Sequence, residues 1–262
     1  MISYIGKIAI EYFRWIVGLF RLFFDILYWL IFGPFKGKPA HRQGIFSQMV
    51  FVGVRSALIV FFVDIFTGIV LAMQIAYQLE KMGAVLYVAS IVAISLCREL
   101  SPVLTGLVVA GRAGSSIAAE LGSMKVTEQI EALDTMAINP TRFLAVPRFL
   151  ALLVMLPALT ILGNISGILG GFLVGTGNLN INPDLYMQTS FKHLELKDIY
   201  TGLIKAAVFG IIIALVGCYE GLNTKGGAEG VGRATTRSVV ISFILIILAD
   251  CIITSIFYFS KI

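Results

Sequence analysis

The chain has 262 residues, of which 58% are hydrophobic and 13% are charged, and its formal net charge is +5. Soluble domains hold about 25% charged residues, so this composition excludes an ordinary soluble domain and indicates a membrane protein. At about 20 apolar residues for each crossing, we expect an all-α integral membrane bundle of about five transmembrane helices.

The first apolar segment, residues 1–33, has a pattern that favours an amphipathic helix lying in the membrane interface. Its polar and small positions recur at intervals of three or four residues: Lys7, Glu11, Arg14, Gly18, Arg21 and Asp25. On a helix they share one stripe. Burying charges near the bilayer centre costs about 2.5–3.5 kcal/mol each, which an interfacial helix avoids. A signal peptide or a true span is the alternative.

Residues 34–48 are predicted to be a basic linker, because Pro34 and Pro39 break the helix around Lys36 and Lys38. The transmembrane domain follows over 49–262. Its five apolar segments run at about 50–79, 84–113, 144–176, 198–220 and 238–259.

The distribution of lysine and arginine predicts the orientation of these spans. With the amino terminus in the cytoplasm, the inside flanks hold 14 of these residues and the outside flanks hold 4. Since positive residues concentrate on the cytoplasmic side, we expect a cytoplasmic amino terminus and a periplasmic carboxyl terminus.

Two spans carry residues that shape helices. The second span is too long for a straight crossing, and Pro102 at its middle is expected to kink it. The third span contains Gly163, Gly167 and Gly171, whose four-residue spacing permits close contact with another helix. Glycine is also simply common in membrane helices, which is the alternative explanation.

Ionisable residues lie deep in the predicted spans. Asp64 in the first span is the candidate fifth such residue. The other four form a candidate intramembrane charge network: Arg98, Glu99, Lys205 and Asp250. Two positive and two negative groups could neutralise one another within the bundle. Such a network either fixes the helix register or lines a substrate path.

A polar segment, 111–142, separates the second and third spans. An amphipathic helix is predicted from about Val126 to Met136, with Glu128, Glu131 and Asp134 along one side, and Asn139-Pro140 ends the segment. A short acidic helix on the positive side of the membrane suits docking of a soluble partner. The alternative is a solvated connecting loop that happens to be helical.

Four motifs resemble the MlaE (YrbE) family of ABC transporter permeases. They are Arg-Glu-Leu-Ser-Pro-Val-Leu at 98–104, Ala-Gly-Arg-Ala-Gly-Ser at 110–115, the run from Ala119 to Ile130, and Gly-Arg-Ala-Thr-Thr-Arg-Ser-Val-Val at 232–240. The resemblance covers about residues 45–260, with Ser101 standing where the family pattern has glycine. It implies the permease subunit of an ATP-driven complex that moves glycerophospholipids between the inner and outer membranes of a bacterium.

The resemblance also implies partners and site residues. A homodimer would hold the phospholipid between its two copies, with an ABC ATPase on the cytoplasmic side, a hexameric MCE-domain protein on the periplasmic side and no nucleic acid. Residues 123–136 would be the coupling helix. The implied ATPase-coupling residues are Glu120, Met124, Thr127, Glu128, Ile130, Glu131 and Leu133. The implied lipid-cavity residues are Leu71, Gln74, Gln78 and Met82.

The sequence contains no recognisable motif for ATP binding, metal binding or catalysis. No Gly-x-x-x-x-Gly-Lys-Ser/Thr loop is present, so we expect ATP and Mg²⁺ to bind a partner chain and no cofactor to bind here. The three cysteines are far apart and the two histidines are isolated, so no metal site or catalytic site is predicted. Two alternatives stay open: a gradient-driven secondary transporter of lipids or amphiphiles, and an intramembrane enzyme using Asp64 and Asp250.

Overall fold

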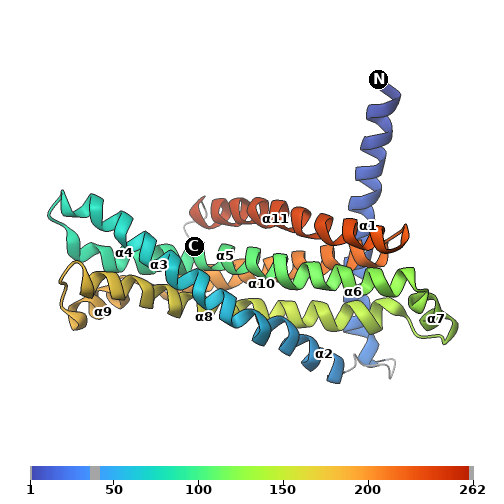
Figure 1. The fold of residues 1–262 in the computed structure, drawn as a ribbon, viewed down its shortest axis with the longest axis horizontal. Coiled ribbons are helices and arrows are strands. Elements are labelled where there is room, and N and C mark those ends of the chain that lie inside the picture. The colour runs from blue at the N-terminus through green and yellow to red at the C-terminus, as the bar shows by residue number, and fades with distance from the viewer. Residues whose placement is uncertain (1, 36–41, 260–262) are drawn as a thin grey trace. The chain divides into compact units, whose positions relative to one another are not determined.

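The computed structural model describes residues 2–35 and 42–259, with side chains throughout these ranges except at 2–9, 11–12 and 34–35. Helices joined by short turns make up these residues, and no β-strand occurs among them (Figure 1). The predicted all-α membrane fold is therefore confirmed. Lys36 and Lys38 of the predicted linker lie outside the described residues, and the end of that linker is helical.

The α-helices of the described ranges follow one another along the chain. They are α1 (Ile2–Phe35), α2 (Arg42–Met49), α3 (Arg55–Glu80), α4 (Val88–Ser95), α5 (Ser101–Val109), α6 (Ser115–Val126), α7 (Gln129–Thr135), α8 (Val146–Gly177), α9 (Pro183–Lys192), α10 (Leu196–Leu222) and α11 (Gly227–Phe259). A 3-10 turn lies at Val85–Tyr87, and π-helical turns lie at Val50–Val54, Leu96–Leu100, Ala110–Gly114 and Thr141–Ala145.

Six helical stretches in the described part of the chain are long and apolar enough to cross a membrane. They are Phe13–Gly33, Arg42–Glu80, Val85–Val126, Thr141–Gly177, Leu196–Leu222 and Gly227–Phe259. The last five contain the five predicted spans. The first stretch, Phe13–Gly33, falls within α1. Its length and composition permit a membrane crossing, whereas its polar stripe favours a position in the interface. The interfacial position of α1 therefore stays a prediction.

The expected kink in the second span takes the form of a change in helix type. A π-helical turn at Leu96–Leu100 comes directly before Ser101 and Pro102. Proline lacks a backbone N–H and its ring crowds the carbonyl four residues earlier, so a wider turn at this point accommodates it. The π turn also places Arg98 and Glu99 at the irregular part of the span.

The contacts of the chain divide it into two compact units. Unit 1 comprises 1–49, 110–152 and 211–242, and unit 2 comprises 50–109, 153–210 and 243–262. The long helices α8, α10 and α11 each contribute residues to both units.

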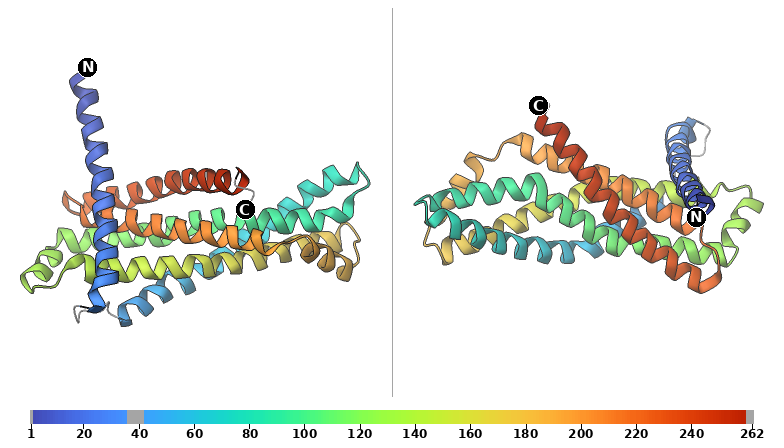
Figure 2. Two further views of the ribbon diagram at one scale, coloured as in Figure 1. Left: turned by 180° about the vertical axis from the view of Figure 1, so that it is seen from behind. Right: turned by 90° about the horizontal axis from the view of Figure 1, so that it is seen from above.

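In unit 1, α1 packs against the end of α10 and crosses it steeply (Figure 2). The indole N–H of Trp15 donates a hydrogen bond to Glu220 at 2.6 Å, and the Trp15 ring meets Tyr219 edge to face at 5.9 Å. Gly18 faces the Tyr219 ring so closely that a Cβ there would collide with it. Tryptophan and tyrosine favour membrane–water interfaces, so these contacts are typical of a helix attached at the end of a span.

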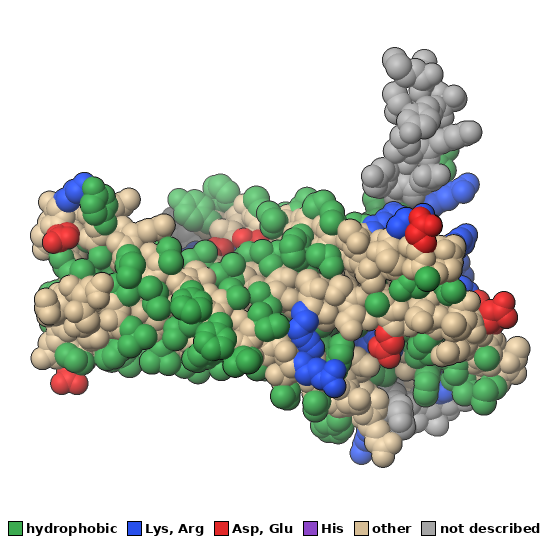
Figure 3. Space-filling model, viewed as in Figure 1, with side chains coloured by type: hydrophobic (Ala, Val, Ile, Leu, Met, Phe, Trp, Pro, Cys, Tyr) green, Lys and Arg blue, Asp and Glu red, His purple; other side chains and the backbone are tan. Residues whose placement is uncertain are grey.

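In unit 2, α3 and α8 meet through glycines. A Cβ on Gly68 would collide with the carbonyl of Gly167, and one on Gly170 would collide with the carbonyl of Ile65. The predicted role of Gly167 in close helix contact is thereby confirmed, and α3 is the partner helix. The outer surface of α3 is apolar (Figure 3), with Phe62 and Phe66 among its exposed residues.

Candidate functional site

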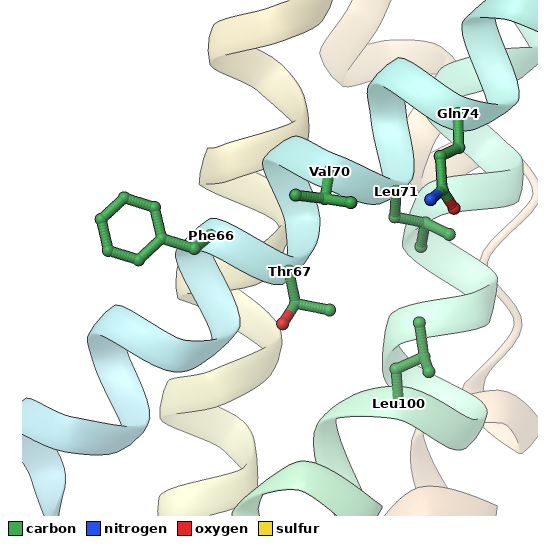
Figure 4. Close-up of a pocket in the computed structure, with 6 residues that line it drawn as sticks. All are labelled: Phe66, Thr67, Val70, Leu71, Gln74 and Leu100. Atoms are coloured by element: carbon green, nitrogen blue, oxygen red, sulfur yellow. The ribbon is translucent and has the colours of Figure 1, made fainter.

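A pocket of about 410 Å³ in unit 2 is the first candidate site. It is lined by Phe66, Thr67, Val70, Leu71 and Gln74 of α3 and by Leu100. In Figure 4, Thr67 and Leu71 project from α3 toward Leu100, while Phe66 extends outward. The Thr67 hydroxyl donates to the carbonyl of Val63 at 2.7 Å, so Gln74 supplies the polar group that is available to a ligand. An apolar pocket with one amide suits hydrocarbon chains next to a polar linkage.

Half of the implied lipid-cavity residues line this pocket. Leu71 and Gln74 belong to it. Gln78 is exposed one turn farther along α3, and Met82 is 77% exposed in the turn after α3 ends, so neither lines the pocket. Thr67 was missed by the sequence analysis, although its spacing from Leu71 and Gln74 places it on the same helical face.

A buried ion cluster centred on Lys205 is the second candidate site, also in unit 2. The Lys205 ammonium forms ion pairs with Glu99 and, at 2.8 Å, with Asp250, and it donates to the Thr254 hydroxyl at 2.7 Å. The Lys205 side chain is fully buried, whereas Glu99 is 34% exposed. The structure brings together Glu99, Lys205 and Asp250 of the predicted network, and Thr254 joins them although the sequence did not point to it.

The proposal that Arg98 belongs to the same network is wrong. Its guanidinium faces Asp198 at 3.7 Å instead. Asp198 lies in the first turn of α10, beyond the apolar core of that span, so depth within a span gave no sign of it. The Lys205 cluster therefore contains two carboxylates and one cation, rather than the predicted two carboxylates and two cations.

Asp64 also stands apart from the cluster. It is fully buried, and its carboxylate forms no ion pair with any described residue. Gly163 lies opposite, where an added Cβ would be 2.7 Å from the Asp64 carboxylate. The Ser101 hydroxyl is its polar neighbour. The described contacts thus give Asp64 no partnership with Asp250, which the intramembrane-enzyme alternative requires.

The third candidate site is the joint between α6 and α7 in unit 1. The amphipathic helix predicted from about Val126 to Met136 is α7, which runs only from Gln129 to Thr135. The implied coupling helix over 123–136 is not continuous, because α6 ends at Val126. Glu128 between them has a φ of 59°, in the left-handed region that interrupts an α-helix. Lys125 forms an ion pair with Glu131 and so links the two helices. The Lys125 hydrogen bond lowers the pKa of the Glu131 carboxyl below its ordinary value of 4.5.

The implied ATPase-coupling residues divide by exposure. Thr127, Glu128 and Glu131 are exposed, and Met124 and Leu133 are half-buried. Ile130 is 5% exposed, so it anchors α7 to unit 1 rather than offering itself to a partner. Glu120 is 51% exposed, but its carboxylate is already paired within the chain, 2.8 Å from the guanidinium of Arg148, whose side chain is 5% exposed. Nothing in the sequence indicated that Arg148, near the start of a span, would be the partner of Glu120.

These features define a multi-pass membrane subunit of a transporter: apolar helices, a pocket on an exposed apolar helix, and an exposed acidic joint between spans. The chain belongs to the MlaE permease family, since the model of the family Permease MlaE matches residues 45–256.

Similar proteins come from distant organisms. A probable ABC transporter permease protein of Rickettsia typhi is 43% identical over 254 residues, covering 97% of this chain and 96% of its own. The intermembrane phospholipid transport system permease protein MlaE of Haemophilus influenzae is 36% identical, covering 98% and 97%. The chloroplastic protein TRIGALACTOSYLDIACYLGLYCEROL 1 of Arabidopsis thaliana is 35% identical, covering 85% and 63%.

Proposed function

We propose that this chain is the permease subunit of an ATP-driven complex that moves glycerophospholipids between the inner and outer membranes of a bacterium. The α3 pocket is the observation that carries this proposal. Its volume of about 410 Å³ and its apolar lining suit acyl chains, while Gln74 offers hydrogen bonds to the polar linkage of a glycerophospholipid. The phospholipid transport named for the Haemophilus influenzae relative supports the same substrate class.

The pocket lies at the surface of a single copy, on a helix whose Phe66 and Val70 are 60% and 52% exposed. A second copy of the chain would cover this apolar surface and enclose the lipid, which is the basis for placing the substrate at a homodimer interface. A periplasmic MCE-domain hexamer would then receive or deliver the lipid at the far side of the membrane.

The α6–α7 joint would be the docking element for a cytoplasmic ABC ATPase, which would bind the ATP and Mg²⁺. Glu128, Glu131 and Asp134 are exposed on it, so it presents negative charge to a partner. In this arrangement the amino terminus lies in the cytoplasm, the carboxyl terminus lies in the periplasm, and α1 rests along the membrane surface.

Transport by the reconstituted complex tests the proposal. The chain, its ATPase and the MCE-domain protein would be placed in vesicles, and fluorescent phospholipid transfer to acceptor vesicles measured. We expect transfer to require ATP and Mg²⁺ and to survive collapse of the proton gradient. Transfer that stops with the gradient and continues without ATP would refute the proposal in favour of a secondary transporter.

Docking is tested separately by co-purification. Glu128→Lys and Leu133→Asp should abolish recovery of the ATPase while the protein remains in the membrane. The matched control is Glu80→Lys, because Glu80 is exposed at the other end of a span. Normal ATPase recovery with both joint variants would show that the ATPase docks elsewhere.

A further inference from the structure

A second pocket, in unit 1, lies where α1 crosses the end of α10. Its volume is about 310 Å³, and its lining includes Gly18, Arg21, Asp25, Thr141, Tyr219 and Asn223. The α3 pocket shares none of these residues. The lining is rich in polar groups, which makes it unsuited to hydrocarbon and suited to a charged ligand.

Two opposite charges of this pocket are available to a ligand. Arg21 and Asp25 are four residues apart on α1, so they lie on the same helical face one turn from each other. Among the described residues, neither forms an ion pair with the other or with a third side chain. As far as the described residues go, the pocket thus presents a cation and an anion side by side, each without an ion-pair partner.

The position of the pocket at the ends of two spans indicates the level of lipid headgroups. Tyr219 and Asn223 stand at the point where the apolar span of α10 ends, and Thr141 begins the helical stretch that leads into α8. Helix ends of spans lie at the membrane–water boundary, and the Trp15–Tyr219 contact beside the pocket is typical of that depth. Phe20 and Phe24 of α1 are 59% and 64% exposed, which offers apolar surface to acyl chains.

We propose that this pocket binds the zwitterionic headgroup of a membrane phospholipid that carries a phosphate next to a primary amine. Arg21 binds the phosphate, because a guanidinium matches phosphate oxygens in charge and geometry. Asp25 binds the ammonium, and the polar groups of Tyr219 and Asn223 line the remaining surface. Because Asp25 repels a second anion, a lipid with phosphate alone binds less well. The site goes beyond the proposed transport function and does not depend on it.

Fluorescence of Trp15 reports on this site locally. The chain has two tryptophans, so Trp29→Phe leaves Trp15, which contacts the lining residue Tyr219, as the only one. The full chain with this change would be reconstituted in two kinds of phosphatidylglycerol vesicles. One contains brominated phosphatidylethanolamine and the other contains brominated phosphatidylglycerol, and in both lipids the bromine lies near the start of the acyl chains. We expect phosphatidylethanolamine to quench Trp15 more strongly at equal mole fraction.

Variants assign the preference to the two charges. Asp25→Asn should remove the preference for phosphatidylethanolamine, and Arg21→Gln should weaken its binding about tenfold, as loss of a charge-assisted hydrogen bond does. Asp25→Glu and Arg21→Lys, which keep the charges, should retain the preference. Arg14→Gln is the matched control, since Arg14 is an exposed residue of the same helix outside the lining.

Three results would overturn the proposal. They are equal quenching by the two lipids, a preference that survives Asp25→Asn, and relief of the extra quenching by millimolar inorganic phosphate, which would mark a site for free anions. No ATPase or transport step enters this measurement, so its failure is distinct from failure of the proposed function.

Discussion

The ammonium nitrogen of Lys205 on α10 lies 2.8 Å from a carboxylate oxygen of Asp250 on α11. The same ammonium also pairs with Glu99, and the Lys205 side chain is fully buried. One buried cation therefore holds two carboxylates from two other helical segments of unit 2.

Replacing the central cation should destabilise the protein strongly. Lys205→Met leaves Glu99 and Asp250 without their cation, and breaking a buried ion pair by removing one partner costs about 3–5 kcal/mol. We expect a clear fall in the thermal unfolding temperature of the protein in detergent, measured by circular dichroism. Adding Glu99→Gln and Asp250→Asn to Lys205→Met should restore most of the stability. A triple variant no more stable than Lys205→Met would show that the two carboxylates are not what Lys205 holds.

Substitutions of Glu120 and of Glu128 should differ in their effect on the unfolding temperature. Glu120→Gln leaves the buried guanidinium of Arg148 without its carboxylate, so we expect it to lower the unfolding temperature. Glu128→Gln changes an exposed side chain with no ion pair among the described residues, so it should leave that temperature unchanged while weakening ATPase recovery. Equal unfolding temperatures for the two variants would contradict the internal role assigned to Glu120.

Gly163 should be intolerant of even one added methyl group as long as Asp64 is present. A Cβ at this position would lie 2.7 Å from the buried Asp64 carboxylate, which has little room to move. Overpacking of this kind costs about 1–3 kcal/mol. Gly163→Ala should therefore lower the unfolding temperature of the wild-type chain and cost much less in an Asp64→Ala background. The double-mutant cycle measures the difference, and additive effects would rule out the contact.

The pKa of Glu131 should rise when Lys125 is removed. The Lys125 hydrogen bond holds this pKa below the ordinary value of 4.5, so the pair's contribution to stability is present above that value. It is lost as the pH falls through the lowered pKa of the folded protein. Lys125→Met should return the pKa to its ordinary range, measured by NMR of glutamate labelled with ¹³C at the carboxyl group. Lys192→Met serves as the control, and a pKa unmoved by Lys125→Met would contradict the link.

The sequence predicted the spans well because apolar length alone defines them. Each of the five predicted segments lies within a helical stretch of the structure. The glycine spacing around Gly167 also predicted a close contact, because four-residue intervals fix one face of a helix. The identity of the facing helix, α3, required the structure.

The partners of charged residues were harder to predict, because the depth of a residue in a span does not tell which neighbouring helix its side chain faces. Arg98 and Glu99 are neighbours in sequence and equally deep, yet they pair with different residues of α10, Asp198 and Lys205. The break at Glu128 was missed for another reason. Glutamate is a good helix former, so local preference gave no sign of its left-handed conformation.

The glycine contact between α3 and α8 has a mechanical consequence. Because the backbones of Gly68 and Gly167 touch, no layer of side chains lies between the helices to yield when one of them moves. A backbone contact of this kind resists separate motion of the two helices, so we expect α3 and α8 to move together. A change in the volume of the α3 pocket would then come from its opposite wall, where Leu100 is the last residue of a π-helical turn.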